Sequence, residues 1–137
     1  MRRAPALLAL ACLLAAGCGG GGGNEEEAVR KVLRDYLTGI AAANGERACA
    51  QLTEAARDEV VETVTAAFPG DGGLSCEEAV AELSADLAPG RKSALLNPVF
   101  REVSITGDKA EVAVKGLDGA AELTRVDGEW RVVRGGV

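Results

Sequence analysis

The sequence contains no histidine and few aromatic residues in its 137 positions. Without histidine, neither a histidine general base nor a Ser-His-Asp triad can operate, and no histidine can bind a metal. One tyrosine, one tryptophan and two phenylalanines are present, which neither favours nor forbids a ligand cavity, since aliphatic residues can line one. Basic residues are also in the minority, with 15 Lys and Arg against 21 Asp and Glu. The absence of a basic patch argues against binding to nucleic acid.

The first eighteen residues have the pattern of a cleaved export signal. Arg2 and Arg3 precede an apolar stretch over residues 4–16, which is shorter than the about 20 residues that a membrane-spanning helix needs. Small residues then lead to Cys18, and this run resembles the bacterial lipobox. The resemblance implies cleavage before Cys18 and a diacylglyceryl group on that cysteine. Two alternatives stay open, namely lipidation at Cys12 and an ordinary secretory signal that contains a cysteine.

This interpretation divides the chain into three parts. Residues 1–17 are the signal peptide, residues 18–24 are the lipidated cysteine with a glycine-rich tether, and residues 25–137 are the folded domain. The mature chain would lose two positive charges with the signal and carry a net charge of −8, so anionic headgroups would repel it. Two acyl chains suffice for stable anchoring. We therefore expect an extracytoplasmic domain held at the cell membrane by lipid on Cys18.

Cys49 and Cys76 are the two cysteines that remain for the folded domain. An even pair in an exported domain predicts a disulfide. It would close a loop of about 27 residues and stabilise the fold by roughly 3–4 kcal/mol in the chain-entropy model. The alternative is a redox or metal pair, but the spacing is unlike Cys-x-x-Cys and further ligands are lacking. No metal and no cofactor is predicted.

Helical periodicity characterises the first part of the domain. Apolar residues recur at helical spacing up to Ile40, behind a capping-box pattern of Asn24 and Glu27. A short second helix is expected over residues 46–52, with its apolar side turned inward.

Two further helices are expected next. The first has Thr53 as its cap and carries Phe68 on its apolar side. The second follows a capping box of Ser75 and Glu78 and stops at the Pro-Gly pair of residues 89–90.

After about residue 97 the hydrophobic period changes to two, which indicates half-buried strands. Four such runs are separated by breaks, and those at residues 107–108 and 127–128 are two-residue hairpin signals. Helices followed by a four-strand antiparallel meander predict an α+β fold, with N-terminal helices packed on a curved C-terminal sheet. The length suits one domain with a single core.

Two segments carry a family resemblance. Residues 32–37, which read VLRDYL, resemble the first helix of NTF2-like domains, and residues 126–132, which read VDGEWRV, resemble their closing hairpin. The resemblance implies a cystatin-like α+β cone in which a bent sheet wraps a long helix and often encloses a pocket. The chain also resembles small actinobacterial lipoproteins of unassigned function. The loop before Ser75 and the helix behind it are less typical, which leaves another small α+β fold open.

Tyr36 and Trp130 are the candidate pocket residues. NTF2-like enzymes, such as ketosteroid isomerases, use a pocket carboxylate with a tyrosine or protonated acid as oxyanion donor. The pattern turns no carboxylate inward here, and Asp35 lies on a different helix face from Tyr36.

We therefore expect no enzyme but a non-catalytic binding or interaction module of the cell envelope, monomeric because the outward strand positions are polar. Its partners would be the membrane, through the lipid on Cys18, and an envelope protein or a small ligand. Two alternatives stay open. One is a carrier of a small apolar ligand, and the other is an isomerase- or cyclase-type enzyme that uses the cone pocket.

Overall fold

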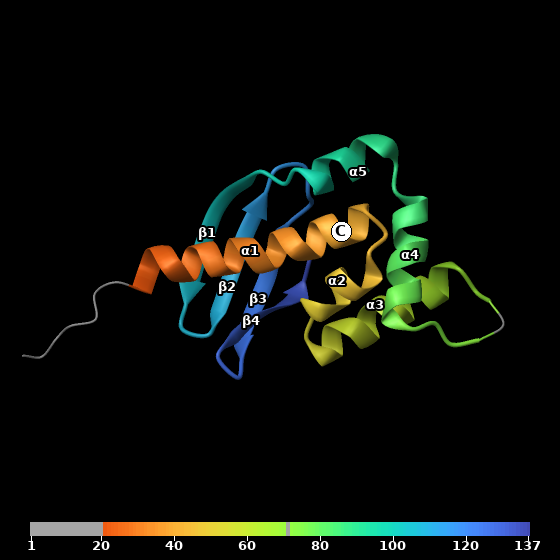
Figure 1. The fold of residues 1–137 in the computed structure, drawn as a ribbon, viewed down its shortest axis with the longest axis horizontal. Coiled ribbons are helices and arrows are strands. Elements are labelled where there is room, and N and C mark those ends of the chain that lie inside the picture. The colour runs from red at the N-terminus through yellow and green to blue at the C-terminus, as the bar shows by residue number, and fades with distance from the viewer. Residues whose placement is uncertain (1–20, 71) are drawn as a thin grey trace, which may run out of the picture.

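The computed structural model describes residues 21–70 and 72–137. The predicted signal peptide and Cys18 therefore lie outside the described residues. Within them, five helices pack on an open four-strand antiparallel sheet of order β1-β2-β3-β4, which confirms the predicted α+β class and the meander (Figure 1). The elements are α1 (Gly21–Ala41), α2 (Gly45–Ala50), α3 (Glu54–Ala67), α4 (Cys76–Asp86), α5 (Pro89–Leu96), β1 (Phe100–Thr106), β2 (Lys109–Val114), β3 (Ala120–Val126) and β4 (Glu129–Arg134).

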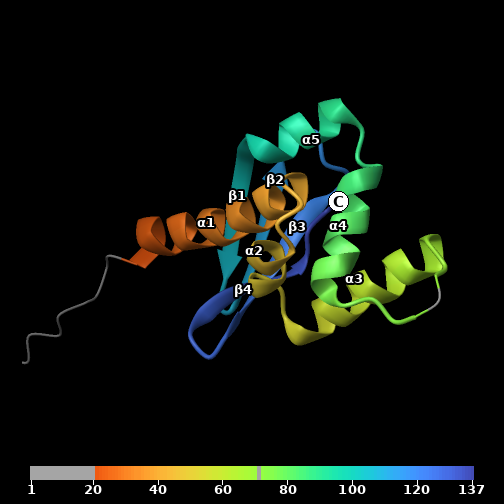
Figure 2. The same ribbon diagram turned by 45° about the vertical axis from the view of Figure 1, so that its right-hand side comes forward.

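The core lies between α1 and the sheet. α1 crosses one face of the sheet in Figure 1, and the turned view in Figure 2 shows it against the same face. Its buried residues recur at helical spacing, and the sheet contributes alternate residues of each strand. Because these aliphatic side chains meet, they fill the space between helix and sheet. The fully buried members of this contact are Val29, Leu33, Leu37, Ile40, Val112 and Val132.

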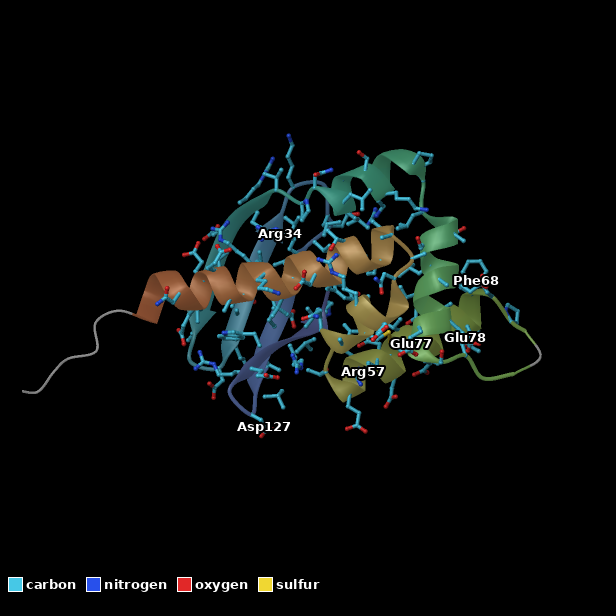
Figure 3. The ribbon with its side chains drawn as sticks, in the orientation of Figure 1. Arg34, Arg57, Phe68, Glu77, Glu78 and Asp127 are labelled. Carbon is cyan, nitrogen blue, oxygen red and sulfur yellow. A yellow bond between two sulfur atoms is a disulfide. The ribbon has the colours of Figure 1, made fainter. Side chains whose placement is uncertain are left out.

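Both predicted hairpin turns are present. Residues 107–108 join β1 to β2, and Asp127-Gly128 joins β3 to β4, with Asp127 at the tip in Figure 3. Asp127 has φ +50° and Gly128 has φ +80°. Positive φ at both central residues is what a type I′ turn requires, and this turn matches the twist of the two strands.

A disulfide joins α2 to α4, as predicted for Cys49 and Cys76. The helices approach so closely beside it that a Cβ on Gly45 would lie 2.5 Å from the Cα of Glu77. From α3, the Nε of Arg57 donates to the carbonyl oxygen of Cys49 at 2.8 Å (Figure 3). The three helices are thus fastened together at one end of the fold.

Two local predictions are wrong, and one helix was not predicted. α1 begins at Gly21, so Asn24 lies inside the helix instead of capping it, and the helix takes in part of the glycine run assigned to the tether. α4 ends at Asp86, before the Pro-Gly pair as predicted, but Pro89 then opens the unpredicted α5, because a proline in the first turn loses no helical hydrogen bond. Phe68 follows the last residue of α3 and is 41% exposed, since the helix end projects beyond the core.

Candidate functional site

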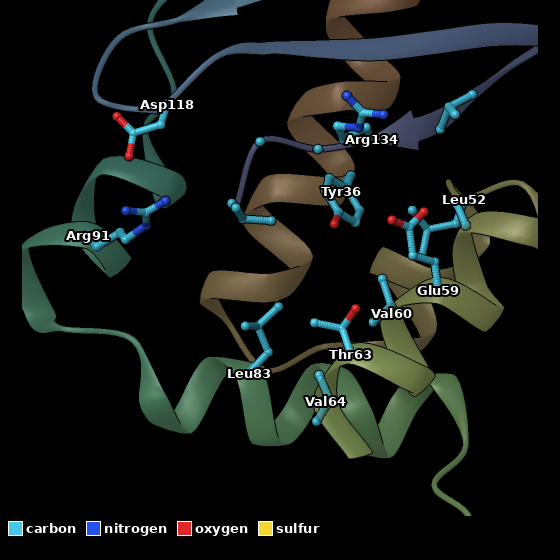
Figure 4. Close-up of a pocket in the computed structure, with 15 residues that line it drawn as sticks. Tyr36, Leu52, Glu59, Val60, Thr63, Val64, Leu83, Arg91, Asp118 and Arg134 are labelled. Atoms are coloured by element: carbon cyan, nitrogen blue, oxygen red, sulfur yellow. The ribbon is translucent and has the colours of Figure 1, made fainter. Parts of the chain in front are cut away.

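A cavity of about 430 Å³ lies where the C-terminal half of α1 and the end of β4 meet α3, α4 and α5 (Figure 4). It is distinct from the filled contact between α1 and the sheet. Its volume is in the range of small-molecule sites, about 300–1,000 Å³. Much of the wall is aliphatic, with contributions from Leu52, Ala56, Val60, Val64 and Leu83.

Tyr36 places a hydroxyl group in this wall. Its position three residues after the buried Leu33 and four before the buried Ile40 turns the ring inward, and Tyr36 is 3% exposed. The hydroxyl points into the cavity (Figure 4). No side-chain hydrogen bond within residues 21–70 and 72–137 involves this hydroxyl. The hydroxyl therefore lies at the cavity surface as a polar group available to a bound molecule, and the buried side-chain atom that lacks a partner among the described residues is instead the Oγ1 of Thr65.

The backbone of Gly135 packs directly against the Tyr36 ring. A Cβ at this position would lie 2.1 Å from Cε1 and 2.9 Å from the hydroxyl oxygen of Tyr36. Real side chains do not approach so closely, so the backbone can lie against the ring only because residue 135 is a glycine. This contact fixes where the hydroxyl points.

Burial keeps the tyrosine in its neutral form. It raises the pKa of Tyr36 to about 12, and the negative charge of Glu59 adds a smaller effect in the same direction. At neutral pH the hydroxyl therefore carries its proton. It can both donate and accept a hydrogen bond.

Four charged residues also line the cavity. Glu59 and Arg134 lie on the side of Tyr36, and Arg91 and Asp118 lie on the opposite side (Figure 4). Arg134 also forms an ion pair of 3.3 Å with Glu122 of β3. The two acids and two bases leave no net charge. Both acidic residues are exposed, so neither is a carboxylate held in a dry environment.

The structure brings Tyr36 to the cavity but not Trp130. Trp130 is 6% exposed and belongs to the core beside the N-terminal half of α1. The guanidinium carbon of Arg125 lies 4.7 Å from its ring centroid, and Arg125 also pairs with Glu25 of α1. Trp130 therefore packs and stacks with a cation, and it does not line the cavity.

Asp35 links two helices and does not line the cavity. Its carboxylate pairs with Lys31 at 2.6 Å and with Arg47 of α2 at 2.5 Å. Burial by itself would raise the pKa of Asp35, but hydrogen bonds and charge from the two bases outweigh it and lower that pKa. The carboxylate is thus used in positioning α2 against α1.

Sequence reasoning missed the charged lining residues and Gly135. No sequence motif includes Glu59, Asp118 or Arg134. Arg91 was not identified because α5, the helix that carries it, was not predicted. One signal was available, because a glycine directly after the last strand often marks a close approach of the backbone.

No protein-family model, curated protein or solved structure matches the chain. In residues 21–70 and 72–137, no three His, Cys, Asp or Glu side chains gather where a metal ion could be held. None of the helices described above is both long enough and apolar enough to cross a bilayer. The basis for assigning a function is therefore the cavity itself.

Proposed function

We propose that the chain is a lipid-anchored extracytoplasmic module that binds a small, mostly apolar molecule beside Tyr36 without transforming it. The observation that carries this proposal is the 430 Å³ cavity, with its aliphatic wall and the Tyr36 hydroxyl that points into it. Small-molecule sites combine these two features, since apolar walls supply affinity and a few placed polar groups supply orientation. The signal-like N-terminus with Cys18 supports the location.

The NTF2-like resemblance is part of this proposal. A long α1 across a four-strand meander, closed by the hairpin of residues 126–132, agrees with a divergent cone of that type. The resemblance implies that such a cone often encloses a pocket, and the cavity here lies beside the C-terminal half of α1 and the end of β4.

Two other functions have weaker support. An isomerase or cyclase would need a carboxylate made basic by burial near Tyr36. Glu59 and Asp118 are the acidic lining residues, and both are exposed. A protein-interaction surface would need a contiguous apolar patch. The large exposed apolar side chains of the described residues are instead distributed over several places: the end of α3, the end of α5 and the segment after it, the β3–β4 hairpin, and residue 137.

Extraction of a co-purifying molecule tests the proposal. The full chain is expressed with its own N-terminus in a bacterium, purified from membranes and extracted with solvent for mass spectrometry. We compare it with Thr63→Phe, which places a ring at an exposed lining position of α3, and with Ala66→Phe, an exposed position of the same helix outside this cavity. A small molecule present in the wild type and in Ala66→Phe but lost in Thr63→Phe is expected. Equal amounts in all three proteins, or no molecule in any, would contradict the proposal.

A further inference from the structure

A ligand in the cavity has to satisfy the Tyr36 hydroxyl. The ring is buried, but the oxygen lies at the cavity surface, where it has no hydrogen bond within the described part of the chain and is not among the buried atoms that lack a partner. A ligand that displaces water from this oxygen leaves it unpaired unless the ligand replaces the hydrogen bond, and an unpaired polar group is unfavourable. A ligand that bonds this hydroxyl is therefore favoured over a purely apolar molecule of the same shape.

Glu59 sets the second requirement. Its carboxylate points toward the part of the cavity that the Tyr36 hydroxyl faces (Figure 4), and its charge acts on that hydroxyl. An ionised carboxylate only accepts hydrogen bonds, whereas a tyrosine hydroxyl donates and accepts. One hydroxyl group on a ligand satisfies both, since it accepts from Tyr36 and donates to Glu59.

The charges of the lining give an ionised ligand no net attraction. Glu59 and Arg134 lie on the same side of the cavity with opposite charges, so the attraction of either sign of ion to one residue is offset by its repulsion from the other. Either ion would also lose hydration next to a side chain that is 3% exposed. We infer that the cavity selects an uncharged molecule with a hydroxyl group on a compact apolar body. This inference rests on the proposed function and names the chemistry of its ligand.

Three probes with one ring and different polar groups test the inference: cyclohexanol, cyclohexanecarboxylate and cyclohexylammonium. The full chain is labelled with tyrosine carrying ¹³C at Cζ and placed in lipid nanodiscs, with empty nanodiscs as background. The sequence has one tyrosine, so the spectrum has one signal, and its shift reports hydrogen bonding at Tyr36. Affinities in the variants are measured by saturation transfer to the probe.

Cyclohexanol is expected to shift the Tyr36 signal saturably and to bind at least about ten-fold more tightly than either charged probe. Tyr36→Phe should weaken cyclohexanol binding about five-fold, the range of one net hydrogen bond. Glu59→Gln should raise the affinity for cyclohexanecarboxylate several-fold, because it removes the repelling charge. Glu62→Gln, a matched change on α3 outside this cavity, should leave all three affinities unchanged.

A charged probe that binds as tightly as cyclohexanol would overturn the inference. So would cyclohexanol binding that leaves the Tyr36 signal unmoved, because the probe would then occupy another site. If no probe binds, the inference fails, and the extraction experiment decides the proposed function separately. A co-purifying molecule that is lost in Thr63→Phe would still support a ligand-binding cavity.

Discussion

The buried Tyr36 side chain should make the stability of the fold depend on alkaline pH. Its pKa is about 12 in the folded chain and close to the ordinary value of 10.0 in the unfolded chain. Between these values the folded state keeps a proton that the unfolded state has lost. The stabilisation is therefore complete below about pH 10 and is lost as pH rises toward 12, by up to about 1.4 kcal/mol per pH unit.

Comparison of the wild type with Tyr36→Phe isolates this effect. Urea denaturation followed by the fluorescence of Trp130, the one tryptophan, gives the free energy of unfolding at each pH. Lysine titration contributes to both proteins and cancels in the difference. From about pH 9 to about pH 11, the wild type should lose roughly 1.3 kcal/mol relative to Tyr36→Phe, as linkage requires for pKa values near 10 and 12.

Direct titration provides the control. Tyrosinate absorbance near 295 nm comes from one residue, and its midpoint should lie close to 12 in the folded protein and close to 10 in denaturant. Glu59→Gln should lower the folded midpoint, because the Glu59 charge is one of the two causes of the shift. Parallel stability profiles for wild type and Tyr36→Phe, or a folded midpoint near 10, would refute the burial of this side chain and the cavity wall built on it.

Three further predictions concern the fold and the anchor. Gly135→Ala should destabilise the fold by about 1–3 kcal/mol, because the added methyl group would overpack the tyrosine ring. Gly90→Ala has nothing within 4 Å of its added Cβ and should change the free energy of unfolding by less than about 1 kcal/mol. Chemical denaturation measures both variants, and equal effects would contradict the close contact. Replacing Cys49 and Cys76 by alanine should lower the free energy of unfolding by roughly 3–4 kcal/mol, and an unchanged denaturation midpoint would refute a stabilising role for the disulfide. Cys18→Ser should release the chain from the membrane fraction, and retention there would contradict the lipid anchor.

Much of the fold follows from local sequence signals. The capping box of Ser75 and Glu78 and the cap at Thr53 are both present, because each depends on a side chain and a backbone group three residues apart. The hairpins depend on two adjacent residues each, and one of them shows the positive φ values of the turn that its Asp-Gly pair predicts. The disulfide could be predicted by counting cysteines. These features are recognisable because their causes lie close together in the chain.

The cavity could not be predicted in the same way. It is lined by side chains from α1, α3, α4, α5, the β2–β3 connection and the end of β4. The spacing of apolar residues within one segment does not indicate which distant segments come together. Glu59 and Arg134 look like ordinary solvent-facing charges in their own segments. Pro89 acts both as the end of one helical pattern and as the first turn of the next helix, and sequence alone favoured the first interpretation. Local signals thus predicted the inward turn of Tyr36 but not the groups that meet it.

The geometry of α1 separates the two parts of the proposed function. Tyr36 lies fifteen residues beyond Gly21, so at about 1.5 Å per residue the cavity stands roughly 22 Å along the helix from its start. A lipid on Cys18 would attach just before that start, at the other end from the cavity. For the same reason, loss of the anchor and loss of the cavity are independent defects, and a variant of one part leaves the other part to be measured.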